Sequence, residues 1–540
     1  MTQSVSQPGA VQMSGGETLV ASLVAHKVDT VFGIPGTHNL EIYRHLRAAK
    51  IRHVTPRHEQ GAGYAADGYA RTSGRPGVAL VTTGPAVLNL AAALAQAYSD
   101  SVPVLAIAPG MPLRHPQRGN GLLHEMRDQR GALAGIVRHA HRVSSHDELT
   151  EAVAQIFADF SAERPRPAYL EIPLDLLGEQ GEVAIAMPIR VARRRPDDTQ
   201  VMQAATLLNQ ARRPGVLAGG GARGAAAQVV AVAERLHAGV LTTTNGKGVI
   251  PETHPLSLGA AVHLPAAAEW LADRDVLLAV GTELAPSDFW YGPPQLPGDV
   301  IRIDLDPAQL LINARPALPI CADAAATLDD LLPLLKDAGG ASEPGAASGV
   351  PAKIKAQARA EGARWTVWLD ALAAALPKRA LVLADNAMAC YYGALGNLPV
   401  HEPGAFGFPT GFGTLGYAVP AAIGAKVARP RRPVVALCGD GGLMFSCQEL
   451  ATAAAEGISL PIVVFVNGGY GEIREKMRAA SIDPIGVDLP VPDLIALATA
   501  LGGAGYAVRT PDELRRLVKA SLEHPGPTLL VIEEEEEGHP

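Results

Sequence analysis

Short apolar runs rich in β-branched residues recur along the chain between longer stretches rich in alanine and leucine. Uninterrupted apolar runs are typical of strands that are buried on both faces, as in parallel sheets covered by helices. The pattern therefore predicts an α/β fold built from doubly wound parallel sheets. We expect strands at Val78–Thr83, Val102–Ala108, Val276–Gly281, Val300–Leu305, Val434–Gly439 and Pro461–Asn467.

Two segments interrupt this alternation and predict domain boundaries. Pro188–Asp198 is basic and contains proline, and Lys336–Lys353 is rich in glycine, alanine, serine and proline, which are typical linker compositions. A chain of 540 residues is also too long for a single hydrophobic core. We predict three domains of ordinary size, spanning residues 1–187, 199–335 and 354–535.

Composition favours a protein that acts on small molecules. The net charge is −8 and the longest run of basic residues is Arg193–Arg195, so nothing in the charge pattern indicates nucleic-acid binding. The first residues lack a basic start followed by an apolar stretch, and no window approaches the roughly 20 apolar residues of a membrane span. The four cysteines show no CxxC spacing. We expect a cytoplasmic globular protein.

The segment after the predicted strand Val434–Gly439 carries candidate chemistry. A GDGG turn precedes a helix expected from Ser446, and such a turn offers backbone N–H groups to a phosphate. Asp440 and Asn467, 27 residues apart, would leave neighbouring parallel strands at the same sheet edge. Carboxylate and amide oxygens suit Mg²⁺ or Ca²⁺. Two interpretations fit: a metal site over a diphosphate, or a glycine turn in which Asp440 caps a helix.

The GDG motif with its distant asparagine resembles the motif of thiamine-diphosphate-dependent enzymes. Nearly the whole chain is similar to the acetolactate synthase and 2-oxoacid decarboxylase superfamily. This family usually has two successive asparagines where the chain has Val466 and Asn467, and the spacing assigns Asn467 to the metal-ligand position. The other segments that carry the resemblance are Gly33–Tyr43, Arg57–Arg71, Thr82–Pro109 and Gly411–Pro430.

The resemblance implies a pyrimidine-binding N-terminal domain, a Rossmann-like middle domain and a C-terminal domain that binds diphosphate and Mg²⁺. Asp440, Asn467 and the carbonyl of Gly469 would hold the Mg²⁺. Thiamine diphosphate supplies the nucleophilic carbon and accepts the electrons released on decarboxylation. The other implied cofactor-binding residues are Pro35, Gly36, Glu59, Asn89, Asn386, Gly413, Leu415, Gly439, Gly441, Gly442, Tyr470 and Gly471.

Three of these implied roles have ordinary alternatives. Glu59 would activate the cofactor through its pyrimidine ring, and the small and apolar residues after it lead us to expect burial that favours its protonated form; it could instead be a solvated loop carboxylate. Leu415 would support the bent cofactor, or simply pack in a core. Asn386 would contact the diphosphate, or form a turn after a strand.

The resemblance also implies an assembly, because it places Glu59 and Asp440 of one active site on different subunits. A homodimer is then the minimum, and a homotetramer is common among relatives. The active sites would lie at the dimer interface, with a 2-oxo acid as the small-molecule substrate.

Two loops bear on the choice of reaction. Both loops resemble 5-guanidino-2-oxopentanoate (2-ketoarginine) decarboxylases: Gly121–Arg130 and Gly468–Met477. Acetolactate synthases have Phe-Gln-Glu in the first of these loops. The resemblance to 2-ketoarginine decarboxylases implies formation of 4-guanidinobutanal and CO₂. The alternatives are a carboligase that joins two 2-oxo acids, as acetolactate synthases do, and a catalytically silent cofactor-binding or regulatory subunit. Intact Glu59, Asp440 and Asn467 argue against the silent subunit.

Candidate substrate residues follow from charge and aromaticity. Aromatics are 4% of the chain, yet Phe289, Trp290 and Tyr291 directly follow Asp288. This combination suits a guanidinium, although the aromatics could instead pack a domain or subunit interface. His124 is a candidate proton donor near neutral pH, or a surface histidine. Further acidic candidates, each equally interpretable as a surface charge or salt-bridge partner, are Glu125, Asp128 and Glu472.

The middle domain contains two glycine-rich segments, Gly215–Gly224 and Thr242–Gly259, which are similar to FAD-binding segments of acetolactate synthases. A glycine-rich turn alone is weak evidence for a bound nucleotide. We predict that no flavin is bound.

Overall fold

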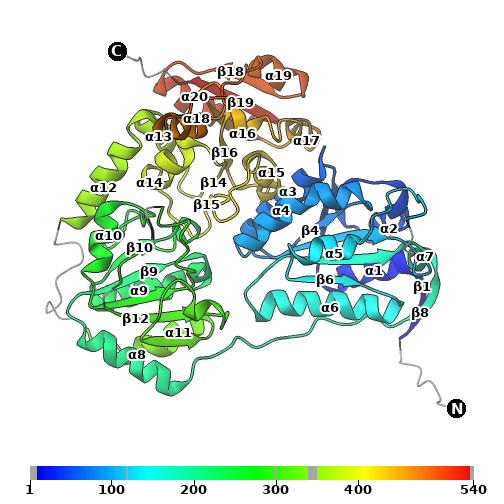
Figure 1. The fold of residues 1–540 in the computed structure, drawn as a ribbon, viewed down its shortest axis with the longest axis horizontal. Coiled ribbons are helices and arrows are strands. Elements are labelled where there is room, and N and C mark those ends of the chain that lie inside the picture. Colours follow the sequence, from blue (N-terminus) through cyan, green and yellow to red (C-terminus); the bar gives the residue numbers. More distant parts are fainter. Residues whose placement is uncertain are drawn as a thin grey trace. The chain divides into compact units, whose positions relative to one another are not determined.

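The computed structural model describes residues 9–116, 119–290, 292, 294–296, 298–337 and 349–534. Within these ranges the strands form three parallel sheets, with helices between successive strands (Figure 1). A fourth, two-stranded sheet pairs β1 (Val11–Ser14) with β8 (Gln180–Val183) in antiparallel register. The predicted α/β class with three parallel sheets is confirmed.

The chain divides into two compact units, and the division begins inside the predicted linker Pro188–Asp198. The second predicted linker, Lys336–Lys353, lies largely outside the described residues, and helix α12 (Val350–Glu361) begins within it. The three domain boundaries stay predictions. The first unit comprises Met1–Ala192, Val419–Pro430 and Ser446–Glu456, and the second comprises Arg193–Ala418, Arg431–Phe445 and Gly457–Pro540.

The sheet of the first unit has the strand order β3-β2-β4-β5-β7-β6. The chain runs outward from β2 to β3 and then returns to β4 on the other side of β2, so the order reverses between β2 and β4. Ligands of doubly wound folds bind at the carboxyl ends of such a strand pair. The strands are β2 (Thr30–Gly33), β3 (Arg52–Val54), β4 (Gly77–Leu80), β5 (Val104–Gly110), β6 (His139–Arg142) and β7 (Ala168–Pro173).

Several helices of the first unit begin at polar caps. The Ser14 hydroxyl caps α1, and the His58 ring accepts the Gln60 N–H at the start of α3, satisfying donors that a helix start leaves unpaired. The helices are α1 (Gly15–Ala25), α2 (Leu40–Leu46), α3 (Glu59–Ser73), α4 (Pro85–Ser99), α5 (Gln129–Ala134), α6 (His146–Ala162), α7 (Leu174–Gly178) and α17 (Glu449–Ala455), together with most of α15 (Ala418–Ala428).

The C-terminal sheet, in the second unit, has the order β15-β14-β16-β17-β19-β18. It reverses between β14 and β16, as the first sheet does between β2 and β4. Strands β16 and β17 pair in parallel with Gly439 opposite Phe465. The strands are β14 (Leu381–Ala384), β15 (Phe406–Gly407), β16 (Val434–Gly439), β17 (Leu460–Val466), β18 (Ala504–Ala507) and β19 (Pro527–Glu533).

The middle sheet, also in the second unit, has the order β10-β9-β11-β12-β13. Its strands contribute side chains to two buried clusters. The strands are β9 (Pro214–Ala218), β10 (Gly239–Thr242), β11 (Val276–Val280), β12 (Asp299–Asp304) and β13 (Leu318–Cys321). The helices of this region are α8 (Asp198–Gln210), α9 (Ala226–Leu236), α10 (Pro265–Ala272) and α11 (Ala324–Leu331).

All six predicted strands are present with ends shifted by at most a few residues, but the helix expected from Ser446 is wrong at its start. The chain first forms a four-residue helix, α16 (Asp440–Leu443), and then turns through Ser446, whose carbonyl accepts the Glu449 N–H at 3.0 Å. Helix α17 therefore begins only at Glu449. The remaining C-terminal helices are α13 (Ala363–Ala375), α14 (Leu395–Asn397), α18 (Gly471–Ala479), α19 (Leu494–Ala500) and α20 (Pro511–Ser521).

In the described ranges, none of the helices has both the length and the hydropathy that crossing a membrane requires.

Candidate active site

The structure brings Asp440 and Asn467 together at the edge of the C-terminal sheet. Asp440 follows the last residue of β16 and is 3% exposed. Its Oδ2 accepts the Gly469 N–H at 2.9 Å, and its Oδ1 lies 3.5 Å from the backbone nitrogen of Asn467. Because β17 ends at Val466, Asn467 emerges beside Asp440. The parallel pairing of two buried strands accounts for this contact.

The oxygen atoms gathered here fit a hard cation. Within the described part of the chain, Asn467 Oδ1 is buried and has no hydrogen-bond partner. A Cβ at Gly471 would lie 2.7 Å from Asn467 Nδ2, and one at Gly441 would lie 3.0 Å from the Gly469 carbonyl oxygen. Glycines thus keep space around a carboxylate, an amide oxygen and a carbonyl, which is a donor set that Mg²⁺ accepts.

The described residues contain no cluster of three or more His, Cys, Asp or Glu side chains that could hold a metal ion. A site with one carboxylate leaves much of a divalent charge uncompensated. Such a site suits a cation that shares its charge with phosphate oxygens.

Asp385, which the sequence analysis missed, braces the loop that carries Leu415. It follows β14, is 1% exposed, and accepts the N–H groups of Gly416 at 3.1 Å and Ala418 at 3.3 Å. Burial raises the pKa of Asp385 to about 6. The braced loop includes Gly413, with φ +70°, and holds Leu415 half-buried. Leu415 is therefore presented on a fixed loop and is not a core residue.

Asn386 braces the same loop. Its Nδ2 donates to the carbonyls of Pro409 at 3.1 Å and Thr414 at 3.0 Å. These contacts match the alternative that Asn386 shapes a turn after a strand, and its contact with a diphosphate stays a prediction. The Tyr470 N–H is also engaged within the protein, since it donates to the Val487 carbonyl at 2.9 Å.

Two glycines predicted to approach the diphosphate lie at the end of β16 and just after it: Gly439 is its last residue and Gly442 lies in α16. A Cβ at Gly442 would sit 3.3 Å from the Asp385 carboxyl carbon, and one at Gly439 would sit 3.3 Å from Ala387 Cβ. Both positions are therefore tight against residues that follow β14.

Glu59 is the first residue of α3 and pairs with Asn89. The Asn89 side-chain amide donates to Glu59 Oε2 at 2.9 Å. The burial that we expected of Glu59 is only partial, because the buried run of α3 begins at Gly61. Glu59 lies at the start of a helix and not in a loop, and its role as activator of the cofactor stays a prediction.

A second carboxylate, Glu449, fixes the backbone before Glu59. Its Oε1 accepts the N–H groups of Arg57 at 3.0 Å and His58 at 3.1 Å, although these residues are about 390 positions away in sequence. Burial raises the pKa of Glu449 to about 6. A Cβ at Gly61 would lie 2.4 Å from Glu449 Oε1, so the glycine makes this contact possible.

His124 belongs to a hydrogen-bonded cluster at the carboxyl ends of β2 and β4. The buried Thr83 hydroxyl lies 2.6 Å from His38 Nδ1 and 3.3 Å from His124 Nδ1, and the two rings are 5.3 Å apart. The pKa of His38 is lowered mainly by burial and to a smaller extent by the charge of His124. His124 also has φ +61°, a conformation that often marks functional sites. His124 is therefore not an isolated surface residue.

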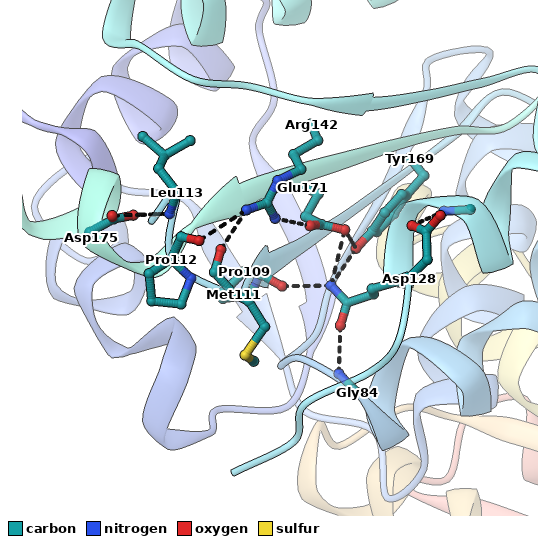
Figure 2. A network of polar contacts seen from close by, with 12 residues as sticks. Gly84, Pro109, Met111, Pro112, Leu113, Asp128, Arg142, Tyr169, Glu171 and Asp175 are labelled. Atoms are coloured by element: carbon teal, nitrogen blue, oxygen red, sulfur yellow. Dashed lines mark hydrogen bonds and ion pairs between the residues drawn. The ribbon is translucent and has the colours of Figure 1, made fainter. Parts of the chain in front are cut away.

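A buried polar network, which Figure 2 shows around Gly84, Tyr169, Glu171 and Arg142, holds the Gly84 backbone. Gln129 Oε1 accepts the Gly84 N–H at 2.7 Å, and Gln129 Nε2 lies 3.3 Å from Glu171, which pairs with Arg142. A Cβ at Gly84 would lie 2.6 Å from the His124 carbonyl oxygen. Gly84, held by this network, therefore allows the His124 backbone to pack closely.

Pro35 and Gly36, predicted to bind the cofactor, lie in the turn after β2. Pro35 is exposed, and the Gly36 N–H donates to Asn39 Oδ1 at 2.8 Å. Their turn precedes His38, so it shares the reversal point of the first sheet with the histidine cluster.

Two acidic candidates have partners within their own region. Glu125 accepts the Gly121 N–H at 2.7 Å and lies 3.0 Å from His115 Nε2. Asp128 caps α5 by accepting the Gly131 N–H at 2.7 Å. The Glu125 contact matches the salt-bridge alternative, whereas the helix cap formed by Asp128 was not predicted. Direct contact of either residue with a substrate stays a prediction.

A cavity of about 340 Å³ adjoins Asn386 in the second unit. Trp290 and Glu472 line it, and so do two tyrosines that the sequence analysis missed, Tyr391 and Tyr392. Asp288 is not among its lining residues. Of the other aromatics singled out from the sequence, Phe289 packs in a buried cluster of the middle region and Tyr291 lies outside the described residues.

Comparison with known proteins agrees with this geometry. Three family models match the chain: the thiamine pyrophosphate enzyme N-terminal TPP binding domain over residues 13–132, the central domain over 201–331, and the C-terminal TPP binding domain over 387–532.

Curated relatives match over nearly full length. A probable 2-ketoarginine decarboxylase of Pseudomonas aeruginosa is 42% identical over 96% of this chain and 94% of its own. A probable acetolactate synthase large subunit of Methanocaldococcus jannaschii is 32% identical over 96% of this chain and 92% of its own. An acetolactate synthase of Arthrospira platensis is 32% identical over 96% of this chain and 94% of its own. The chain belongs to the thiamine pyrophosphate enzyme family.

Proposed function

We propose that this enzyme is a Mg²⁺-dependent decarboxylase that converts 5-guanidino-2-oxopentanoate into 4-guanidinobutanal and CO₂ without oxidation. The observation that carries the proposal is the 42% identity, over 96% of the chain, with a probable 2-ketoarginine decarboxylase. The sequence identities to the acetolactate synthases of M. jannaschii and A. platensis are ten percentage points lower.

The side chains have distinct tasks in this proposal. Asp440, Asn467 and the Gly469 carbonyl would hold Mg²⁺, which the unpartnered Asn467 Oδ1 supports. Glu59 would hold the pyrimidine ring of the cofactor through a hydrogen bond, and thiamine diphosphate would supply the electron sink for decarboxylation. His124, joined to His38 through Thr83, would supply a proton as a general acid near neutral pH.

The test is a substrate panel with thiamine diphosphate and Mg²⁺ present. CO₂ and aldehyde are measured from 5-guanidino-2-oxopentanoate, pyruvate, phenylpyruvate and branched 2-oxo acids. A strong preference for the guanidino acid supports the proposal. Equal or better turnover of a neutral acid contradicts the substrate, and loss of activity without Mg²⁺ tests the metal.

The second candidate is a carboligase that joins two 2-oxo acids. The observation in its favour is the 32% identity to acetolactate synthases over more than nine-tenths of the chain. A carboligase must admit a second carbonyl compound where a decarboxylase needs a proton. Acetolactate formed from pyruvate, with no free aldehyde, would favour this candidate.

We also propose that the enzyme is a cytoplasmic homodimer or homotetramer whose active sites combine Glu59 of one subunit with Asp440 of another. Subunit exchange tests the shared site. Mixing inactive Glu59→Gln and Asp440→Ala proteins should restore activity, because one of the two sites in a mixed dimer is intact. Failure to restore activity after demonstrated exchange contradicts a shared site.

The absence of a flavin stays a prediction. Absorbance of the purified protein near the flavin maximum would contradict it.

A further inference from the structure

Four aromatic side chains line the cavity beside Asn386: Trp290, Tyr391, Tyr392 and Phe408. The rings of the first three meet at steep angles. Trp290 is inclined 87° to Tyr391 and 84° to Tyr392, with ring centroids 6.1 and 5.5 Å apart. The two tyrosine rings are themselves 4.6 Å apart and inclined at 71°. Rings in this arrangement present both faces and edges to one volume, as in sites that recognise organic cations.

Two features fix the rings in place. His263 stacks on Trp290 at 3.9 Å, and its Nε2 lies 2.9 Å from the Glu361 carboxylate. Tyr391 and Tyr392 lie in a π-helical segment, Ala389–Ala394, a rare geometry that frequently occurs at functional sites. Consecutive residues of a regular α-helix do not face the same side, yet both tyrosines line this one cavity.

A carboxylate adjoins the rings. Glu472, in the first turn of α18, accepts a hydrogen bond from the Tyr392 hydroxyl at 3.1 Å. Burial, with the nearby Glu472 charge, raises the pKa of Tyr391, so Tyr391 stays neutral and keeps its hydroxyl as a donor. The cavity therefore combines aromatic surface with one carboxylate, and Lys476 also lines it.

We propose that this cavity is the subsite for the guanidinium end of the substrate, with Glu472 as its counter-ion and Trp290, Tyr391 and Tyr392 as its stacking surfaces. The inference rests on the proposed function and deepens it. A guanidinium is planar, stacks on aromatic faces and bonds carboxylates, whereas an ammonium is a compact and strongly hydrated charge. Asn386 lines the same cavity, which connects the subsite with the residues predicted to bind the cofactor.

Lys476 is the competing cation. It lies 3.0 Å from Glu472, but its side chain is 68% exposed, and an exposed ion pair at this helical spacing contributes little free energy. An incoming guanidinium can therefore take its place at low cost while Lys476 turns into solvent.

Calorimetry on the holoenzyme tests the subsite without catalysis. The probes are 5-guanidinopentanoate, which lacks the 2-oxo group, and 5-ureidopentanoate, its neutral analogue of the same shape. We expect Glu472→Gln to weaken binding of the guanidino probe by about 10- to 100-fold, the usual range for a charge-assisted hydrogen bond. Binding of the ureido probe should change much less.

Controls separate this role from a structural one. Glu475 lies on the same helix, does not line the cavity and has a side chain 54% exposed, so Glu475→Gln should bind both probes like the wild type. Trp290→Leu should weaken the guanidino probe by roughly fivefold through the lost cation–π contact. Far-ultraviolet circular dichroism and cofactor content identify any variant that fails to fold.

The outcomes distinguish the subsite from the reaction. If Glu472→Gln and Glu475→Gln bind the guanidino probe equally, the subsite is overturned even when the wild type decarboxylates the guanidino acid. If Glu472-dependent binding occurs but the guanidino 2-oxo acid is not decarboxylated, the proposed function fails and the subsite stands.

Discussion

The first sheet and the C-terminal sheet have the same strand order but carry different chemistry at the same topological point. In the first sheet, the turns after β2 and β4 hold His38 and Thr83. In the C-terminal sheet, the segments after β14 and β16 hold Asp385 and Asp440. One reversal point thus gathers imidazoles and hydroxyls, and the other gathers carboxylates.

This difference teaches that topology sets where a site lies and side chains set what it does. Burial disfavours the charged form of each group, so it lowers the pKa of a histidine and raises the pKa of a carboxyl group. It lowers the pKa of His38 and raises the pKa of Asp385 to about 6. Burial therefore favours the neutral imidazole at one point and the protonated carboxyl at the other.

The largest effect should come from the first unit, through Glu59. We expect Glu59→Gln to reduce turnover by about 1,000-fold, within the range for loss of acid–base catalysis, while thiamine diphosphate still binds. Steady-state kinetics and exchange of the cofactor's C2 proton measure this. Glu151→Gln, on the exposed surface of α6, is the matched control. Near wild-type turnover in Glu59→Gln would remove Glu59 as the activator.

The corresponding change at the C-terminal sheet is Asp440→Ala. We expect it to weaken Mg²⁺-dependent retention of thiamine diphosphate by about 100-fold, because a carboxylate ligand is lost from an oxygen site. Cofactor titration with and without Mg²⁺ measures the effect. Asp483→Ala, at an exposed position after α18, should bind the cofactor normally. Unchanged affinity in Asp440→Ala would remove the metal assignment and with it the contrast between the two sheets.

The sequence was sufficient to predict positions that follow directly from strands. Apolar runs identified β16 and β17, and the parallel register then placed Asp440 beside Asn467. Contacts between segments that are remote in sequence were not predictable in this way. An example is the hydrogen bond from the Arg57 backbone N–H to Glu449, which lies about 390 residues away. The tyrosines of the guanidinium subsite were missed because a regular helix would not turn Tyr391 and Tyr392 to one side.

Glu449 gives a smaller effect, on stability. Its pKa rises from 4.5 to about 6 on folding, so between these pH values the folded state binds more protons than the unfolded state. The free energy of unfolding should therefore fall as pH rises through this window, by about 2 kcal/mol for this group. In Glu449→Gln that part of the pH dependence should disappear.

Urea unfolding of wild type and Glu449→Gln at several pH values between 4.5 and 7 isolates this contribution, because other titrating groups are common to both proteins. Glu523→Gln, which changes an exposed carboxylate, should retain the wild-type pH dependence. Parallel curves for wild type and Glu449→Gln would show that burial does not shift this carboxylate as proposed.

The smallest effect should be a change in the pKa of His38 at the histidine cluster. It tests directly how the site of the first sheet differs from that of the C-terminal sheet. Burial is the main cause of the lowered pKa of His38, and the charge of His124 is the second. Removing that charge in His124→Gln should raise the pKa of His38, though not to its ordinary value, because burial remains. An NMR titration of the imidazole Cε1–H signals measures it, with His139→Gln as a control remote in the sheet order, on β6. A pKa that falls or stays constant would mean that the two imidazoles titrate independently and that Thr83 joins them in geometry alone.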